Sequence, residues 1–131
     1  MPYKYFIADV FTEEPFNGAQ IAVFPHADDL DQTQMQLIAR ELNLSETAFV
    51  FSPVNGAANR RIRIFTPHAE IDFAGHPVIA VAHVLSTIRE IEPENDQTNV
   101  VFEQNTGPVE VNITHYPYRS DLIQFRLALW Q

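Results

Sequence analysis

Apolar and polar positions follow two periods along this chain, and each period predicts a kind of element. Helical spacing covers Asp31–Leu42, where the apolar residues fall on one face. A second helix is predicted over Pro77–Ile88, and it is apolar nearly all round. Short apolar or alternating runs predict strands at Tyr3–Val10, Gln20–Phe24, Thr47–Phe51, Arg60–Phe65, Asn99–Glu103, Val109–Thr114 and Leu122–Leu129.

The proportion of strands and the apolar second helix together predict the architecture. A helix without a polar face is normally buried, so Pro77–Ile88 needs covering on every side. A curved, mostly antiparallel sheet wrapped around that helix would cover it. Glu90–Gln97 is expected to be an acidic surface loop, and Asn105–Pro108 a turn between two strands. We expect an α+β fold in a single domain, residues 1–131.

Composition and charge narrow the classes of partner. The chain has 131 residues, 46% of them hydrophobic, which is enough to bury a core. Its net charge of −9 would repel a phosphate backbone, so no nucleic-acid partner is expected. No apolar run reaches the roughly 20 residues of a membrane helix, and from the first residues we expect no signal peptide. With no Cys, thiolate chemistry is excluded, and we expect a cytoplasmic protein with no membrane partner.

The histidines do not form a metal-binding pattern. Five are present: His26, His68, His76, His83 and His115. His76 and His83 lie seven residues apart, two turns distant on the predicted helix, whereas a metal site needs three or four convergent ligands. A glycine-rich phosphate loop is also missing from the sequence. We expect neither a metal nor a cofactor.

The first candidate for chemistry is the start of the apolar helix, at Gly75-His76-Pro77. Proline suits the first turn of a helix, where its missing N–H costs nothing. The free N–H groups there, at the positive end of the helix, would suit a carboxylate or phosphate. In the alternative interpretation, Gly75 permits a tight turn and His76 caps the helix.

The second candidate is Ser45-Glu46, between the first helix and a buried strand. Asn43 is a plausible end for that helix. A carboxylate at the mouth of an apolar strand is a candidate acid or base, because desolvation raises its pKa toward neutrality. Alternatively, Ser45 caps a turn and Glu46 is solvated.

Three arginines fall in one predicted strand, at Arg60, Arg61 and Arg63. Alternation puts Arg61 and Arg63 on one face of the strand. We interpret this face as a solvated edge or a lobe interface rather than as an anion site.

These segments, in their order and spacing, resemble the PhzF-like isomerase/epimerase family of phenazine biosynthesis, relatives of diaminopimelate epimerase. The resemblance covers almost the whole chain. The segments that carry it are Ala8–Phe11, Phe16–Phe24, Gln34–Glu46, Arg63–Pro67, Phe73–Pro77 and Phe102–Val109. Two departures stand out: Gly18-Ala19-Gln20 replaces the family's usual Gly-Asn-Pro, and the chain is about half the length of a two-lobed member.

The resemblance implies a diaminopimelate epimerase-like lobe and a set of site residues. Glu46 would be the general acid/base, moving a proton on a small carboxylate-bearing substrate without a cofactor. Ser45, Asp72, Gly75 and His76 would bind that substrate. Diaminopimelate epimerase uses two Cys as acid and base, and this chain has no Cys, so it cannot use that mechanism.

Two functions follow, and the sequence leaves both open. In the first, the chain is a PhzF-like isomerase whose second lobe comes from a homodimer or a partner. In the second, it is a non-catalytic stand-alone lobe or a subunit of a split enzyme. The second lobe's catalytic Asp and Gly-Ser pair have no counterpart in this sequence, and the sequence does not identify the substrate.

Overall fold

One curved sheet of eight strands dominates the computed structural model, which describes residues 3–10, 19–53, 58–72, 74–93, 95–116 and 122–127. The strand order is β1-β2-β3-β4-β6-β7-β8, with β5 paired to β4 beside this path. The described strands pair antiparallel except for β2–β3 and β4–β6. The strands are β1 (Phe6–Val10), β2 (Ala19–Phe24), β3 (Glu46–Phe51), β4 (Arg60–Phe65), β5 (Glu70–Ile71), β6 (Gln97–Gln104), β7 (Gly107–Thr114) and β8 (Leu122–Leu127).

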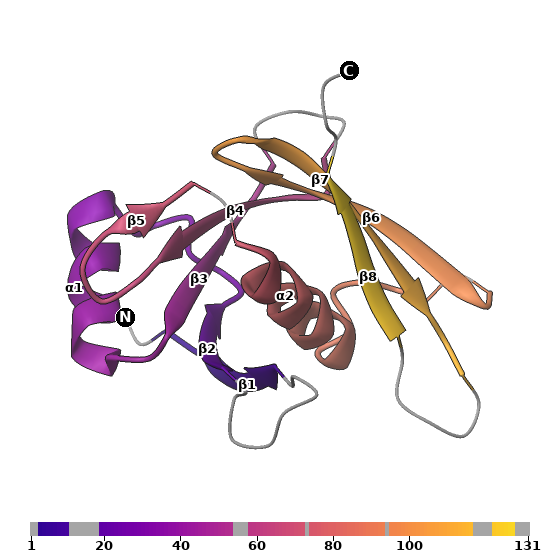
Figure 1. The fold of residues 1–131 in the computed structure, drawn as a ribbon, viewed down its shortest axis with the longest axis horizontal. Coiled ribbons are helices and arrows are strands. Elements are labelled where there is room, and N and C mark those ends of the chain that lie inside the picture. The colour runs from indigo at the N-terminus through magenta and orange to yellow at the C-terminus, as the bar shows by residue number, and fades with distance from the viewer. Residues whose placement is uncertain are drawn as a thin grey trace.

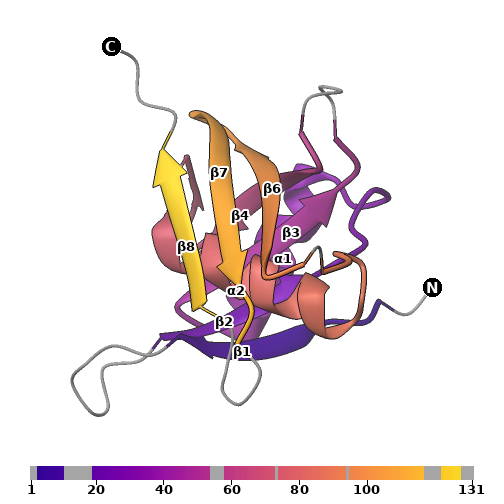
Figure 2. The ribbon, with the colours of Figure 1, turned by 90° about the vertical axis from the view of Figure 1, so that its right-hand side faces the viewer.

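Helix α2 (Gly75–Thr87) lies in the concavity of this sheet, with β1 and β2 on one side and β7 and β8 on the other (Figures 1 and 2). Its residues Val78, Val81 and Leu85 are fully buried. They pack in one cluster with the inward-facing residues of the strands. The curved sheet covers this apolar helix, and the expected α+β fold with a curved, mostly antiparallel sheet around a central helix is confirmed.

Helix α1 (Gln32–Leu42) covers the outer face of the first strands. Met35 and Ala39 pack there in a second cluster with Phe49 and Phe65. Asp31 and Gln34 form a capping box at the helix start. Asn43 ends the helix in the left-handed region at φ 53°, as the sequence predicted for its end.

Successive side chains of each strand point to opposite faces of the sheet. In β3, Ala48 and Val50 face α2, whereas Phe49 faces α1. In β4, Ile62 and Ile64 face α2. The even-numbered residues of β3 and β4 therefore point into the concavity of the sheet, and the odd-numbered residues point outward.

The predicted elements are all present, although several of their ends differ: the strand predicted from Tyr3 begins at Phe6, and the strand predicted over Asn99–Glu103 spans Gln97–Gln104. Helix α2 begins at Gly75 rather than Pro77, because the extended Ala74 precedes it and Pro77 fits the first turn. The segment Glu70–Ile71, for which no strand was predicted, pairs with β4 as a short strand. The predicted turn Asn105–Pro108 is tighter than expected, because Gly107, at φ 130°, already pairs with Gln104.

Some predictions lie outside the described residues. They are residue 11, residues 16–18 and residue 73 of the motif segments, residue 94 of the predicted acidic loop, and the last two residues of the strand predicted to end at Leu129. No helix in the part of the chain that the structure describes is long and apolar enough to cross a membrane.

Candidate active site

Glu46 opens β3 and faces the central helix. Because side chains alternate along a strand, Glu46 lies on the same face as Ala48 and Val50, which pack against α2. Burial raises the pKa of the Glu46 carboxyl above its usual 4.5, and the charge of His76 partly offsets that rise. The carboxyl is therefore half-buried and close enough to His76 to interact with it electrostatically, although the two residues are 30 positions apart.

The start of α2 offers unpaired backbone donors beside this carboxyl. Gly75, His76 and Pro77 form the first turn, and Ala74 precedes it with φ −155° and ψ 140°. The N-cap residue Ala74 makes no side-chain capping hydrogen bond. The N–H groups of Gly75 and His76 lie in the first turn, where backbone donors have no intrahelical partner. The positive end of the helix dipole adds to their affinity for anions. His76 is exposed and lies inside the helix, after the N-cap residue Ala74, so it is not the capping residue.

Gln104 is a third polar group at this point, and the sequence analysis missed it. It ends β6 on the inner face, in line with the buried residues Val100 and Phe102. Its side chain is only 4% exposed, and its Oε1 accepts a hydrogen bond of 3.3 Å from the Ala74 N–H. A polar residue that ends an apolar stripe is the signal that could have identified it.

The remaining predicted site residues lie near this point but with different contacts. Ser45 is exposed and directly precedes Glu46. Asp72 is also exposed, and its Oδ1 accepts a hydrogen bond of 3.2 Å from the Asn105 amide, in the β6–β7 turn. Glu46 and His76 are thus brought together, with Gly75 beside His76. The substrate-binding roles of Ser45, Asp72, Gly75 and His76 stay predictions.

The two alternating arginines lie on the opposite face of the sheet from Glu46. Arg63 donates two hydrogen bonds to Glu70, of 2.8 and 2.7 Å, and this pair lowers the pKa of the Glu70 carboxyl. Arg61 donates to the carbonyl of Glu103 and to the side chain of Asn105. Both guanidinium groups line a shallow hollow of about 370 Å³, and both are already partnered there. The predicted alternation is confirmed, and neither arginine is an open anion site.

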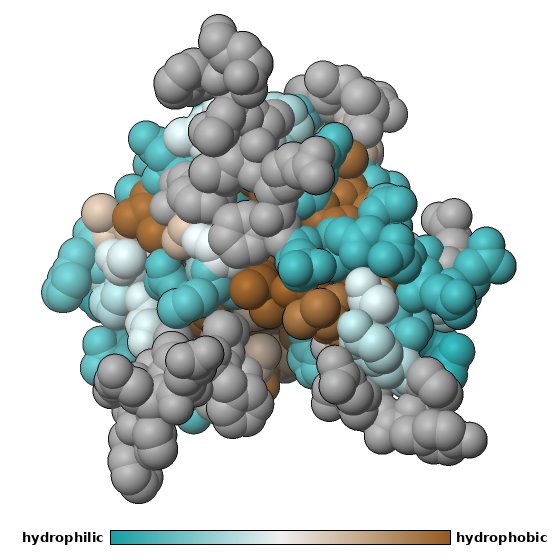
Figure 3. All heavy atoms as spheres, turned by 45° about the vertical axis from the view of Figure 1, so that its right-hand side comes forward, coloured by the Kyte–Doolittle hydropathy of each residue, from teal (hydrophilic) through white to brown (hydrophobic). Residues whose placement is uncertain are grey.

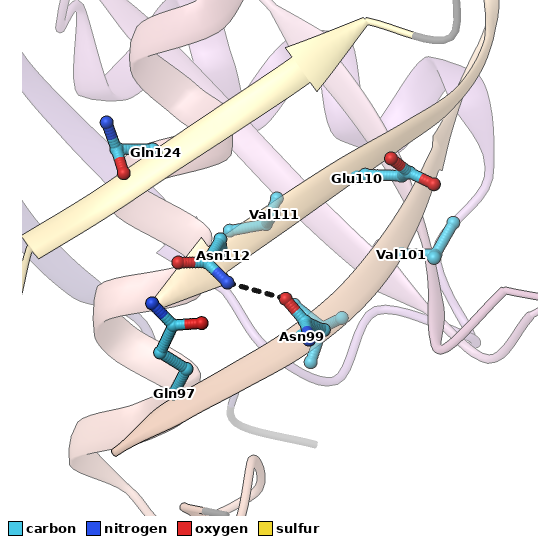
Figure 4. Close-up of a pocket in the computed structure, with 8 residues that line it drawn as sticks. Gln97, Asn99, Val101, Glu110, Val111, Asn112 and Gln124 are labelled. Atoms are coloured by element: carbon cyan, nitrogen blue, oxygen red, sulfur yellow. Dashed lines mark hydrogen bonds between the residues drawn. The ribbon is translucent and has the colours of Figure 1, made fainter. Parts of the chain in front are cut away.

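A larger groove lies elsewhere on the molecule. It has a volume of about 710 Å³ and runs over the outer, polar face of β6, β7 and β8 (Figure 4). Asn112 donates a hydrogen bond of 2.6 Å to Asn99 across it. Neither Glu46 nor His76 lines this groove, so it is separate from the candidate site.

Among the described residues, no group of three His, Asp or Glu side chains is placed to hold a metal ion. The candidate site therefore consists of one carboxyl, one imidazole and a helix start. Such a set can bind a small anion and exchange a proton with it.

Comparison with known proteins gives the site a context. The family model described as "Phenazine biosynthesis-like protein" matches residues 8–126. The chain is 55% identical over 84 residues to an uncharacterized isomerase from Pasteurella multocida, covering 64% of this chain and 29% of that protein. It is 52% identical over 83 residues to a trans-2,3-dihydro-3-hydroxyanthranilate isomerase from Pseudomonas chlororaphis, covering 63% of this chain and 30% of that protein.

A solved structure agrees with these relatives. A phenazine biosynthesis protein of the PhzF family from Bacillus anthracis superposes with a TM-score of 0.78 at 28% identity. The match covers 96% of this chain and 41% of that one. The chain therefore spans well under half the length of the proteins it matches.

Proposed function

Because this chain belongs to the phenazine biosynthesis-like protein family, we propose that it is one lobe of an isomerase or epimerase. The reaction moves a proton between carbon positions of a small carboxylate-bearing substrate. The observation that carries the proposal is the pairing of a half-buried Glu46 with His76 at the uncapped start of α2. The relatives named as isomerases support the reaction class.

In this proposal Glu46 is the general acid and base. A raised pKa makes the Glu46 carboxylate a stronger base than an ordinary glutamate. The carboxylate accepts a proton from one carbon of the substrate, and the carboxylic acid so formed returns that proton to another carbon, so Glu46 ends the cycle as it began. Burial in the concavity supplies the desolvation that this role requires.

The substrate carboxylate would bind at the start of α2. The unpaired N–H groups of Gly75 and His76 are donors, and a protonated His76 adds a positive charge. Ser45 and Asp72 are proposed to contact the polar groups of the substrate. The identity of the P. chlororaphis relative makes trans-2,3-dihydro-3-hydroxyanthranilate the first compound to test.

We propose further that another surface completes the site, either a second copy of this chain or another lobe. The large apolar side chains of Phe6, Ile7 and Leu122 are 36%, 53% and 42% exposed. A hollow of about 320 Å³ between β1 and α2 adjoins Phe6 and Ile7. Apolar surface is also visible between polar residues on the face shown in Figure 3. Exposed apolar surface of this kind favours association.

The test is proton exchange measured in deuterated water. The chain is incubated with trans-2,3-dihydro-3-hydroxyanthranilate, and deuterium incorporation is followed by mass spectrometry. Any exchange should be lost in Glu46→Gln and kept in the matched control Glu41→Gln, whose side chain is exposed on α1. Exchange that survives Glu46→Gln would remove Glu46 as the acid/base.

Binding is measured separately, because one lobe alone is expected to be weakly active or inactive. The stable aromatic analogue 3-hydroxyanthranilate is titrated into isotope-labelled protein, and backbone amide signals are followed by NMR. The amides of Gly75 and His76 should shift most. Strong exchange by a strict monomer would overturn the need for a second lobe, and the absence of any binding would contradict the carboxylate site.

A further inference from the structure

The segment that leads into α2 is held by the end of β6 and the turn that follows it. The N–H of Ala74 donates to Gln104 Oε1 at 3.3 Å. The amide of Asn105 donates to Asp72 at 3.2 Å and to Glu70 at 3.1 Å. Two consecutive residues, Gln104 at the end of β6 and Asn105 in the turn, therefore hold Ala74 and Asp72, directly before Gly75 and His76.

The turn itself is fixed to the sheet. Gln104 pairs with Gly107, whose φ of 130° is a conformation that residues with a side chain rarely adopt. Arg61, from β4, donates to the Glu103 carbonyl at 3.3 Å and to the Asn105 side chain. A turn anchored in this way is a firm support for the segment it holds.

Burial of the Gln104 side chain lowers the stability of the fold, because one of its polar atoms has no hydrogen-bond partner. Its Nε2 is buried with no hydrogen-bond partner, and such an orphan donor is unfavourable. An apolar residue would continue the stripe of Val100 and Phe102 without that cost. The one contact that an apolar residue could not replace is the bond to Ala74, at a helix start that has no side-chain cap.

We propose that Gln104 is a positioning residue of the active site, which acts with Asn105 to hold the start of α2 so that Gly75 and His76 face Glu46. This inference rests on the proposed function for the meaning of the site. Its physical content, the placement of His76 relative to Glu46, is measurable without any turnover.

The test compares two substitutions of the glutamine. Gln104→Met keeps the length of the side chain but removes the acceptor. Gln104→Glu keeps the acceptor and should retain the hydrogen-bonded amide signal of Ala74. The matched control is Gln97→Met, because Gln97 lies exposed on the same strand.

The decisive readout is the titration of Glu46, followed by NMR of its side-chain carbon. For two unit charges, an increase in separation from roughly 5 to roughly 6 Å weakens the coupling by about 0.4 pH units at an effective dielectric of about 20. Gln104→Met should therefore raise the Glu46 midpoint by about that amount. The rise should disappear when His76 is already replaced by Gln, because the coupling is then gone.

Each remaining outcome separates the possibilities. Lower stability of Gln104→Met with an unchanged Glu46 titration would make Gln104 a structural residue only and overturn the proposal. If Gln104→Met does not fold, Asn105→Ala, on the exposed turn, should move the same midpoint upward by a smaller amount, and no movement there would also overturn it. Failure of the proposed function would look different: wild-type protein would not bind 3-hydroxyanthranilate, while the Gln104 effect on Glu46 would remain.

Discussion

Substitutions of Val81 test whether the sheet encloses α2. Its side chain is fully buried, at 0% exposure, in the cluster that joins α2 to the strands. Replacing Val81 with Ala removes two methyl groups, worth about 0.8 kcal/mol each in transfer, plus a term for the cavity. We expect a loss of about 2 kcal/mol, which leaves a folded domain with a lower melting temperature.

Val81→Asp should unfold the domain. The same burial is lost, and an unpaired carboxyl must in addition be desolvated or protonated at a cost of several kcal/mol. The sum of roughly 5 kcal/mol or more is comparable with the whole stability of a typical domain, about 5–15 kcal/mol.

Circular dichroism during thermal and urea unfolding measures both variants. The matched control is His83→Asp, on the same helix but exposed, which should change the stability little. A Val81→Asp protein that melts like wild type would place this face of α2 on the surface and refute the enclosed-helix fold.

Four further predictions concern pH, capping and assembly. The folded-state pKa of Glu46 is raised, so the stability that its protonation contributes is present below about pH 4.5 and is lost as the pH rises through the folded-state value. In urea unfolding, Glu46→Gln should therefore become more stable relative to wild type as the pH rises above about 4.5. The pKa of Glu70 is lowered by Arg63, so Glu70→Gln should cost about 1–3 kcal/mol at pH 7, a difference that shrinks as the pH falls below about 4. Asn43→Gly should be neutral or stabilising and Asn43→Ala destabilising by about 1 kcal/mol, because the position is left-handed. Sedimentation should show a dimer, which Phe6→Lys should weaken if β1 lies in the interface; a strict monomer would contradict self-association.

The fold was predictable because its main determinants are local or periodic. The helical period of α1 and the uniform apolarity of α2 both appear in short windows of sequence. An entirely apolar helix has few ways to be buried, so the enclosing sheet follows from it. The short strand Glu70–Ile71 was missed because its pairing depends on β4 and on the salt bridge from Arg63, which are tertiary contacts.

The candidate site was only partly predictable, for a similar reason. Glu46 and His76 were identified from the motifs around them, and the electrostatic coupling between them agrees with that pairing. Gln104 is 30 residues from Ala74, and only the parallel pairing of β6 beside β4 brings its amide to the start of α2. The contact of Asp72 with Asn105 likewise depends on where the β6–β7 turn lies.

The most direct test of the central claim is the titration of the Glu46 carboxyl by NMR, in wild type and in His76→Gln. We predict a wild-type midpoint above the ordinary glutamate value, because burial disfavours the charged form. The midpoint should rise further in His76→Gln, because the neighbouring positive charge that lowers it is removed. A Glu46 that titrates at the ordinary value and does not respond to His76 would contradict a shared proton-transfer site at the start of α2.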